Sequence, residues 1–229
     1  MSTSNTTSAP AACWACGAAL TSSALLCPDC GKVQPVSNTD YFQVFGLPRG
    51  VTVDRPALEQ EFHRLSRRLH PDRFARTTAN EQQWSLASTA LLNDAYRTLR
   101  DPIQRTEYLL KLEGFEIGEE AIQKDKRAER RQPPADLLEE VFDLNMQLEE
   151  MRMNRKMGED DPALQKDLTQ ARTRFETLLA EVDSDLAAQG ALWDAGTERE
   201  SAANAMAALL DRRRYLRNLV RDVNEVLSA

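Results

Sequence analysis

The sequence predicts an all-α protein: a helical hairpin followed by a three-helix bundle, with a small metal-binding element near the N-terminus. Apolar residues recur every three or four positions in successive segments, the spacing of one helix face. Leu, Ala, Glu and Arg are common and glycine is scarce, which favours helix. Four cysteines lie within residues 13–30, ahead of these segments. The 229 residues are enough for two or three domains.

Residues 40–101 predict two antiparallel helices preceded by a short one. The short helix begins at Asp40 and is stopped by a Gly-Leu-Pro segment. Asp54 caps the next helix, which ends before Pro71 because the residue preceding a proline is pushed out of the helical region. Its apolar face consists of Leu58, Phe62, Leu65 and Leu69. After a loop, the apolar face of the third helix consists of Trp84, Ala87, Leu91, Ala95 and Leu99.

Three longer helices are predicted downstream, and their near-heptad apolar spacing makes a three-helix bundle the economical packing. The first carries Leu137, Val141, Leu144, Leu148 and Met151. The second carries Leu164, Leu168, Ala171, Phe175, Leu178 and Val182. The third carries Ala202, Met206, Leu209, Leu216, Val220, Val223 and Leu227. No strand of any strength is predicted.

These elements divide the chain into five segments. In order, they are a disordered tail over residues 1–12, a tetracysteine metal-binding element with its linker over 13–39, the helical hairpin and a following short helix over 40–114, a charged linker over 115–134, and the three-helix bundle over 135–229.

Charge and hydropathy exclude some classes of function. Nucleic-acid binding rests on Lys and Arg, but the net charge is −7 and Lys32 is the only basic residue among residues 1–40. We therefore expect no nucleic-acid partner, and a zinc-knuckle nucleic-acid module is disfavoured. No apolar run approaches the about 18–20 residues that span a bilayer, so no membrane association is expected. Residues 1–12 do not resemble a targeting peptide, which predicts a cytoplasmic location, or the mitochondrial matrix if a transit peptide has been removed.

The four cysteines predict a structural zinc site. Cys13 and Cys16 form one CxxC pair, and Cys27 and Cys30 form another, each followed by a glycine that a tight knuckle requires. Four thiolates leave no open coordination position, so the metal would be structural rather than catalytic. The alternatives are a disulfide pair, which a reducing cytoplasm disfavours, and a redox CxxC, which would need a βαβ context.

The tripeptide His70-Pro71-Asp72 lies in the loop between the two antiparallel helices. The preceding helix carries, on one side, Arg64, Arg67 and Arg68. A His and an Asp two positions apart are compatible with acid–base catalysis. However, the chain has only two histidines, and no Ser or Cys nucleophile stands in a catalytic context. We therefore expect a binding site and not an enzyme active site.

The basic helix, the His-Pro-Asp loop and the following Leu92-Asn-Asp-Ala-Tyr-Arg-Thr-Leu99 together resemble the J-domain. Further segments are similar to the HscB family of iron–sulfur co-chaperones. They are Asp40-Tyr41-Phe42, Phe45-Gly46-Leu47-Pro48, His70-Pro71-Asp72-Arg73-Phe74, residues 105–114, Leu192-Trp193-Asp194 and Arg214-Tyr215-Leu216. The resemblance covers residues 40–229, and residues 13–30 resemble a tetracysteine element that many bacterial members lack.

The resemblance implies a co-chaperone that is not an enzyme. Its J-domain would dock on a DnaK/HscA-type ATPase chaperone and stimulate hydrolysis, and its bundle would deliver the iron–sulfur cluster scaffold protein as client, assisting cluster assembly and transfer. The implied chaperone contacts are Arg64, Arg67, Arg68, His70, Pro71, Asp72 and Arg73. The arginines would steer docking on an acidic surface. The alternative is a general J-domain co-chaperone for unfolded clients.

The first bundle helix carries a second apolar strip beside its core face, edged by acids. The implied client contacts on this helix are Leu138, Glu139, Phe142, Asp143 and Met146. An exposed apolar strip of this kind suits a specific partner. The resemblance also places Tyr215 as a client contact from the last helix, whereas Met146 departs from the acidic residue expected there. The competing interpretation is a core helix with both strips buried.

Overall fold

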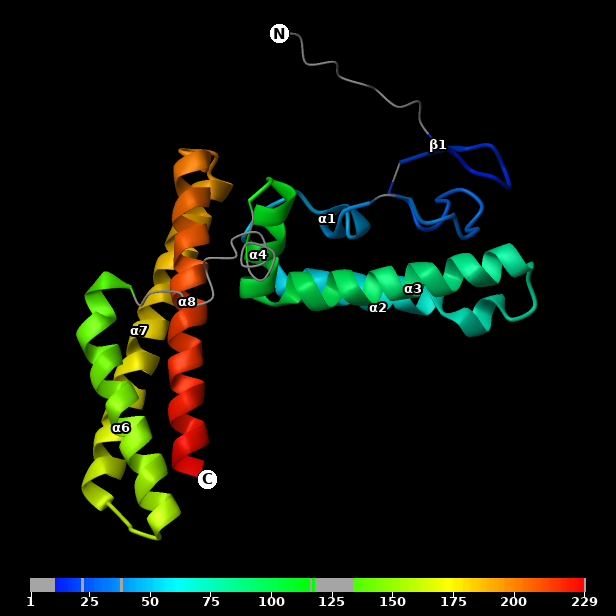
Figure 1. Ribbon diagram of the computed structural model, residues 1–229. Helices are drawn as coiled ribbons and strands as arrows, with labels where there is room; N and C mark the ends of the chain where they lie inside the picture. Colours follow the sequence, from blue (N-terminus) through cyan, green and yellow to red (C-terminus); the bar gives the residue numbers. More distant parts are fainter. Residues whose placement is uncertain (1–10, 22, 38, 116, 118–133, 229) are drawn as a thin grey trace. The chain divides into compact units, whose positions relative to one another are not determined.

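The computed structural model describes residues 11–21, 23–37, 39–115, 117 and 134–228, and it confirms the predicted all-α fold (Figure 1). The chain divides into two compact units, Met1–Arg105 and Thr106–Ala229. Most of the expected tail and of the expected charged linker lies outside the described residues. None of the described helices combines the length and the apolar character that crossing a bilayer requires.

The N-terminal element is a pair of knuckles with a minimal hairpin. Two-residue strands, β1 (Ala11–Ala12) and β2 (Ala19–Leu20), pair antiparallel around the first knuckle. The sequence analysis did not predict them, because two residues are too short to show an alternating pattern. The glycines after the second cysteine of each pair, Gly17 and Gly31, have φ values of 76° and 72°, as the knuckle turns require.

The helical hairpin forms where the caps and prolines predict it. Its elements are α1 Tyr41–Val44, α2 Arg55–Leu69, the 3-10 helix η1 Pro71–Phe74, α3 Ala79–Arg100 and α4 Pro102–Leu112. Asp54 caps α2 by accepting a hydrogen bond from the Ala57 backbone N–H, and Thr78 caps α3 in the same way through Glu81. Buried leucines of α2 pack on α3, which lies alongside it in Figure 1.

In the first half of α3, two buried serines each lie one position after the residue that the apolar pattern predicted. The predicted Trp84 and Leu91 are only half-buried and Ala87 is exposed, whereas Ser85 and Ser88 are buried. The next buried positions are Leu92, Ala95 and Leu99. Two small hydroxyl residues allow close approach to α2, and an apolar pattern cannot identify them because serine scores as polar.

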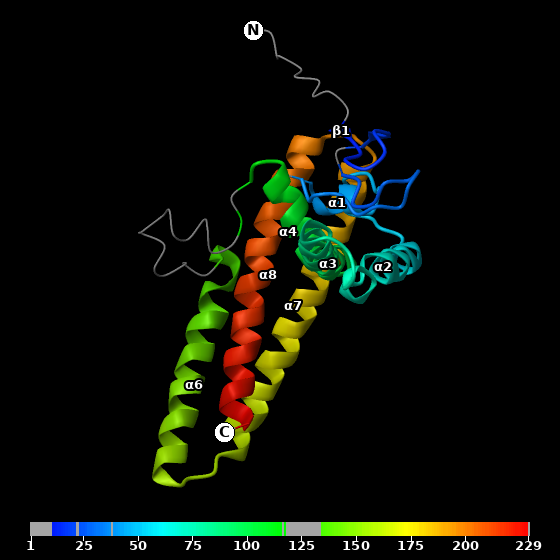
Figure 2. The ribbon, with the colours of Figure 1, turned by 90° about the vertical axis from the view of Figure 1, so that its right-hand side faces the viewer.

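The second unit contains the three predicted long helices, which Figure 2 shows running side by side. After the 3-10 turn η2 (Ala135–Leu137), they are α6 Leu138–Met157, α7 Pro162–Asp194 and α8 Arg199–Ser228. The core contains every residue of the strip predicted for the first helix. On α8 the predicted Leu209, Val220 and Leu227 only flank the core. The buried residues of this helix are Ala202, Ala203, Met206, Leu210, Leu216, Leu219, Val223 and Val226.

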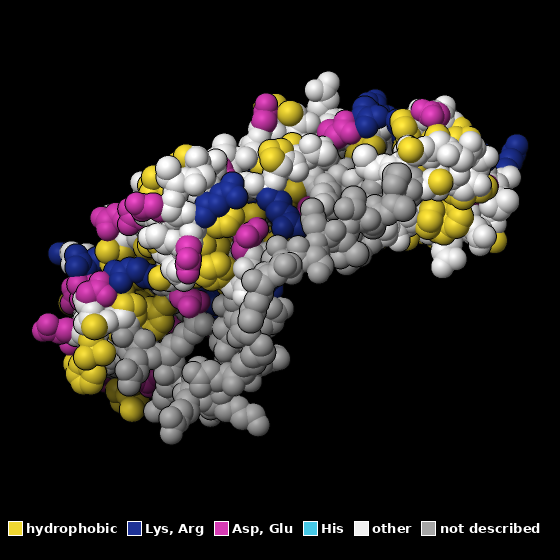
Figure 3. All heavy atoms as spheres, turned by 90° about the horizontal axis from the view of Figure 1, so that it is seen from above, with side chains coloured by type: hydrophobic (Ala, Val, Ile, Leu, Met, Phe, Trp, Pro, Cys, Tyr) yellow, Lys and Arg dark blue, Asp and Glu magenta, His cyan; other side chains and the backbone are white. Residues whose placement is uncertain are grey.

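Surface charge is mixed in sign. On the face drawn in Figure 3, basic and acidic side chains are interspersed with apolar ones. Ion pairs link helices of the bundle: for example, Arg174 Nε lies 2.9 Å from Glu140 Oε2, and Arg213 Nε lies 2.6 Å from Asp183 Oδ1. Such exposed pairs contribute little each, so the buried strips hold the bundle together.

Two phenylalanines of the bundle provide a matched test of this packing. Phe175 is 2% exposed in the core, whereas Phe142 is 64% exposed on α6. Phe175→Ala should lower the free energy of unfolding by about 3–5 kcal/mol because it leaves a cavity. Phe142→Ala should change it by less than about 0.5 kcal/mol. Urea denaturation followed by helical circular dichroism checks both, and equal effects would contradict the assignment of the two faces.

Candidate functional site

The His70-Pro71-Asp72 motif lies at the turn between α2 and α3. His70 ends α2 with an extended ψ of 130°, as the residue before a proline favours. Pro71 begins η1, and Phe74 at the end of that turn is buried and anchors it. The side chains of His70 and Asp72 are 55% and 90% exposed. The motif therefore presents its two polar groups to solvent from an anchored turn.

The motif is also ordered internally. The backbone N–H of Asp72 donates to Nδ1 of His70 at 3.3 Å, and an Asp72 carboxylate oxygen lies 3.5 Å from the same nitrogen. The hydrogen bond closes a small ring around Pro71, whose own φ is fixed, and it orients the imidazole before any partner binds.

Hydroxyl groups of α3 hold the start of the loop. Ser85 Oγ donates to the Leu69 carbonyl at 2.6 Å, and Thr89 Oγ1 donates to the same oxygen at 3.2 Å. A carbonyl at a helix C-terminus lacks an intrahelical donor, so it needs partners of this kind. The two bonds fix the residue directly before His70 against the neighbouring helix.

Side chains from the first turn of α3 hold the end of the loop. Gln82 Nε2 donates to the Thr77 carbonyl at 3.1 Å. Thr78 and Glu81 form a capping box, in which each side chain bonds the other residue's backbone N–H. The loop is thus fastened to α3 at both ends. The sequence analysis missed these residues, because polar residues early in a helix do not by themselves indicate which loop they bond.

The four arginines near the motif are exposed, but they are not equivalent. Arg64 pairs with Glu61, with Nε 2.6 Å from Oε2, and this hydrogen bond raises the Arg64 pKa. Arg67, Arg68 and Arg73 form no ion pair with any described residue. Among the four arginines implied as chaperone contacts, these three therefore carry uncompensated positive charge, while the charge of Arg64 is largely compensated.

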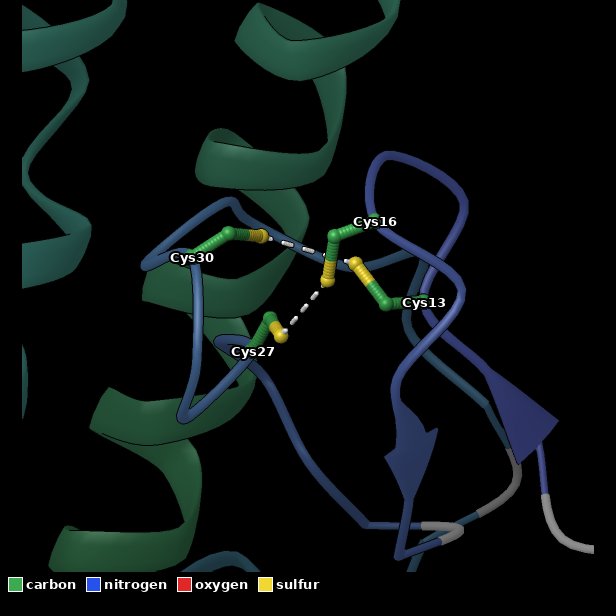
Figure 4. A group of neighbouring side chains, drawn as sticks. All are labelled: Cys13, Cys16, Cys27 and Cys30. Carbon is green, nitrogen blue, oxygen red and sulfur yellow. Dashed lines mark hydrogen bonds between the residues drawn. The ribbon is translucent and has the colours of Figure 1, made fainter.

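The four cysteines come together at one point, from two knuckles that face each other (Figure 4). All four Sγ atoms lie within 4.8 Å of one another, and the Cys13–Cys30 and Cys16–Cys27 sulfurs are each 3.7 Å apart. A tetrahedral site with bonds of about 2.3 Å places its sulfurs about 3.8 Å apart. The donor set therefore fits a single four-coordinate metal ion.

The electrostatics of the four thiols also favour a metal. For Cys13, burial raises the pKa, but hydrogen bonds from the backbone of Ala15 and Cys16 outweigh it and lower the pKa to about 6. For Cys16, a backbone hydrogen bond from Ala18 lowers the pKa, but the other thiols outweigh it and raise the pKa to about 12. Neighbouring thiolates oppose one another's ionisation, so a cation is needed to hold all four.

Gln34 supports the first cysteine and was not anticipated. Its side chain is buried, and its Nε2 donates to Cys13 Sγ at 3.4 Å and to the Lys32 carbonyl at 2.9 Å. An amide donor to a ligand sulfur orients that ligand and offsets part of its charge. A lone glutamine four residues beyond a CxxC pair carries no local signal, so only the fold reveals this role.

The second strip of α6 lies at the surface. Its members Leu138, Phe142 and Met146 are all more than half exposed. The interpretation with both strips buried is therefore wrong for this helix, because only the strip from Leu137 to Met151 is in the core. Leu138 and Phe142 help to line a groove with Ala135, Asp136, Glu139, Val141 and Asn145.

The acids at the start of α6 divide into two groups. Asp136 pairs with Arg212 at 2.7 Å, and Glu140 pairs with Arg174, so both are used within the bundle. Glu139 and Asp143 form no ion pair with any described residue. The two uncompensated acids are the two that flank the exposed strip.

Tyr215 differs from the α6 residues. It is half-buried, packs against the bundle core, and its pKa is raised by burial. It is not among the residues that line the groove beside Leu138 and Phe142. Part of its contribution is thus to the stability of the bundle.

Comparison with known proteins supports one family. No family model matches the sequence. Among solved structures, the chain is similar to human co-chaperone protein HscB, with a TM-score of 0.65 and 26% identity over 94% of this chain and 98% of that one. It is also similar to chaperone HscB from Vibrio cholerae, with a TM-score of 0.56 and 26% identity over 82% of this chain and 97% of that one.

Both similarities extend over nearly the whole length of the solved proteins, so they include the hairpin and the bundle together. The clustered cysteines agree with the tetracysteine element that the sequence resemblance implied. By fold, by sequence identity and by this cysteine cluster, the chain is similar to the HscB co-chaperones.

Proposed function

We propose that the chain is a co-chaperone that stimulates the ATPase of a DnaK/HscA-type chaperone and delivers to it the iron–sulfur cluster scaffold protein. The observation that carries this proposal is the His70-Pro71-Asp72 loop, which is fastened to α3 at both ends and exposes two polar groups. A partner that docks on a preordered loop loses less conformational entropy. Hydrolysis itself belongs to the chaperone, so the chain acts as a binding partner and not as an enzyme.

The arginines and the bundle would divide the work of recognition. Arg67, Arg68 and Arg73 provide uncompensated positive charge beside the loop, which speeds association with an acidic chaperone surface. Leu138 and Phe142 provide an exposed apolar strip for the client, and acidic residues flank this strip. Residues 115–134, in this proposal, link the two.

The tetracysteine element should hold one structural zinc ion. Purified protein should contain about one zinc per chain, because four thiolates at tetrahedral spacing favour this ion. Cys27→Ser should remove the metal, since a hydroxyl is a poor zinc ligand and the remaining three thiols repel. Elemental analysis checks both. Protein that is free of metal yet has protected amides in residues 13–34 would contradict the prediction.

At the concentration that is half-maximal for the parent, replacement of His70 should abolish nearly all stimulation without unfolding the hairpin. His70→Gln removes the exposed imidazole and touches no core residue, so helicity should be unchanged. The affinity for the chaperone should fall by about 10- to 100-fold, as for the loss of a binding hot spot. Steady-state ATPase assays at increasing co-chaperone concentration measure this. Stimulation equal to that of the parent would overturn the proposed function.

Charge removal beside the loop should act through salt-dependent steering. Arg67→Gln/Arg68→Gln should weaken docking at low ionic strength, and the difference should shrink as salt screens the charges. Arg97→Gln is the control, because this arginine is exposed on α3 and already pairs with Asp94 at 2.7 Å. Equal losses for both variants, or a loss independent of salt, would contradict a steering role.

The predicted client contacts are tested with two variants. One changes the exposed residues of α6, and the other changes the half-buried Tyr215 of α8. Leu138→Ala/Phe142→Ala should weaken scaffold binding by about 100-fold at nearly unchanged melting temperature, because both residues are exposed. Tyr215→Ala should also lower the melting temperature, since Tyr215 packs on the core. Calorimetric titration with the scaffold protein measures the affinities.

The control for the strip lies on the same helix. Met153→Ala/Met157→Ala removes two equally exposed apolar side chains near the end of α6 and should leave scaffold binding unchanged. Retained affinity in the Leu138/Phe142 variant would discard the client site. Preserved scaffold binding with strong binding of unfolded polypeptides would instead favour a general J-domain co-chaperone.

A further inference from the structure

Glu81 is an unusual residue for its place on α3. Its side chain is only 3% exposed, although it lies in the first turn of a helix near the surface. Buried carboxylates are rare unless they are paired, because desolvation of the charge is costly. Its two oxygens have different partners, and these partners come from different parts of the first unit.

One carboxylate oxygen of Glu81 bonds to the loop, and the other bonds to the tetracysteine element. Oε2 accepts hydrogen bonds from the Thr78 hydroxyl at 2.9 Å and from the Thr78 backbone N–H at 3.2 Å, where the His-Pro-Asp loop ends. Oε1 accepts from Lys32 Nζ at 2.7 Å. The Lys32 hydrogen bond is the main cause of the lowered Glu81 pKa. A single carboxylate thus joins the loop to the second cysteine knuckle.

An aromatic contact lies beside this ion pair. The ring centroids of Trp14 and Trp84 are 5.6 Å apart with an interplanar angle of 60°, a tilted arrangement at a favourable distance. Trp14 Nε1 also donates to the Val33 carbonyl at 2.8 Å, and Lys32 Nζ lies 5.8 Å from the Trp14 ring. Figure 4 shows a helical ribbon behind the knuckle of Cys27 and Cys30.

The position of Lys32 depends on the knuckle that the metal organises. Its carbonyl accepts hydrogen bonds from the Cys27 backbone N–H at 2.9 Å and from Gln34 Nε2 at 2.9 Å. Among the described residues, the element buries few apolar side chains: a cluster of Cys13, Leu20 and Cys27, against which Ala18 and Ala24 pack, together with Leu25 and Val33. So small a core cannot maintain the fold alone, so metal binding supplies most of its stability.

We propose that Lys32 and Glu81 are positioning residues through which the metal-loaded tetracysteine element fixes the loop that carries His70, Pro71 and Asp72. This inference rests on the proposed function only where it concerns chaperone stimulation. Loss of the metal frees Lys32, which leaves the Glu81 carboxylate buried without its cation. Glu81 then moves toward solvent, the capping box opens, and the end of the loop is released from α3.

Lys32→Met tests the link while leaving all four cysteines in place. Amides at the loop end and in the first turn of α3, residues 77–82, should exchange hydrogen at least about tenfold faster, because their local opening becomes easier. The half-maximal concentration for ATPase stimulation should rise by about three- to tenfold while maximal stimulation stays the same. Lys32→Arg should restore both values, since it retains the cation.

Lys166→Met is the matched control, because it removes one positive charge from an exposed site on α7. It should change neither quantity. Glu81→Gln keeps a capping-box side chain but removes the charge, so adding Lys32→Met to it should have no further effect. Chelation of the metal should accelerate exchange at residues 77–82 in the parent and add little in the Lys32→Met variant.

Several results would overturn the inference. Exchange in Lys32→Met equal to that in Lys166→Met would show that the element does not brace the loop. Faster hydrogen exchange at residues 77–82 with an unchanged half-maximal concentration for ATPase stimulation would show that the contact between the element and the loop does not position the motif for docking. A parent protein that stimulates no chaperone would overturn the proposed function alone, because the exchange measurements need no chaperone.

Discussion

The carbonyl of Leu69 is the point on which the first unit depends. It ends α2, immediately before the motif, and it accepts hydrogen bonds from Ser85 and Thr89 on α3. A helix C-terminus leaves carbonyls without intrahelical donors, and proline at the next position but one prevents the helix from continuing. Pro71 therefore decides where α2 stops, and two hydroxyls from the neighbouring helix fix how His70 leaves it.

This constraint also explains the composition of the hairpin interface. Ser85 and Ser88 are buried where larger apolar residues would be expected, because α2 and α3 must approach closely for the hydroxyl to reach the carbonyl. Leucines resume at Leu92 and Leu99, farther from the loop. On α3, the buried positions nearest the loop are thus small and hydroxyl-bearing, and those farther away are apolar.

The second unit is organised by a different principle. Its core is a continuous apolar cluster along α6, α7 and α8, and its polar contacts are exposed ion pairs that contribute little individually. Because the core face of α6 is already complete, the strip with Leu138 and Phe142 is not needed for folding. An apolar strip that the fold does not need is available for a partner. For this reason the proposed client site is placed on this helix.

The sequence by itself determined the helical elements, their caps and the cysteine spacing, because these depend on local periodicity and on the chemistry of Pro, Gly and Cys. The approach of all four sulfurs to one point could be expected from the two CxxC pairs. Only the tertiary structure decided the register of α3, the split between paired and unpaired acids on α6, and the contacts of Glu81 with Lys32 and Thr78. These features join residues far apart in the chain, and polar side chains carry no periodic signal of the partner that they will meet once the chain has folded.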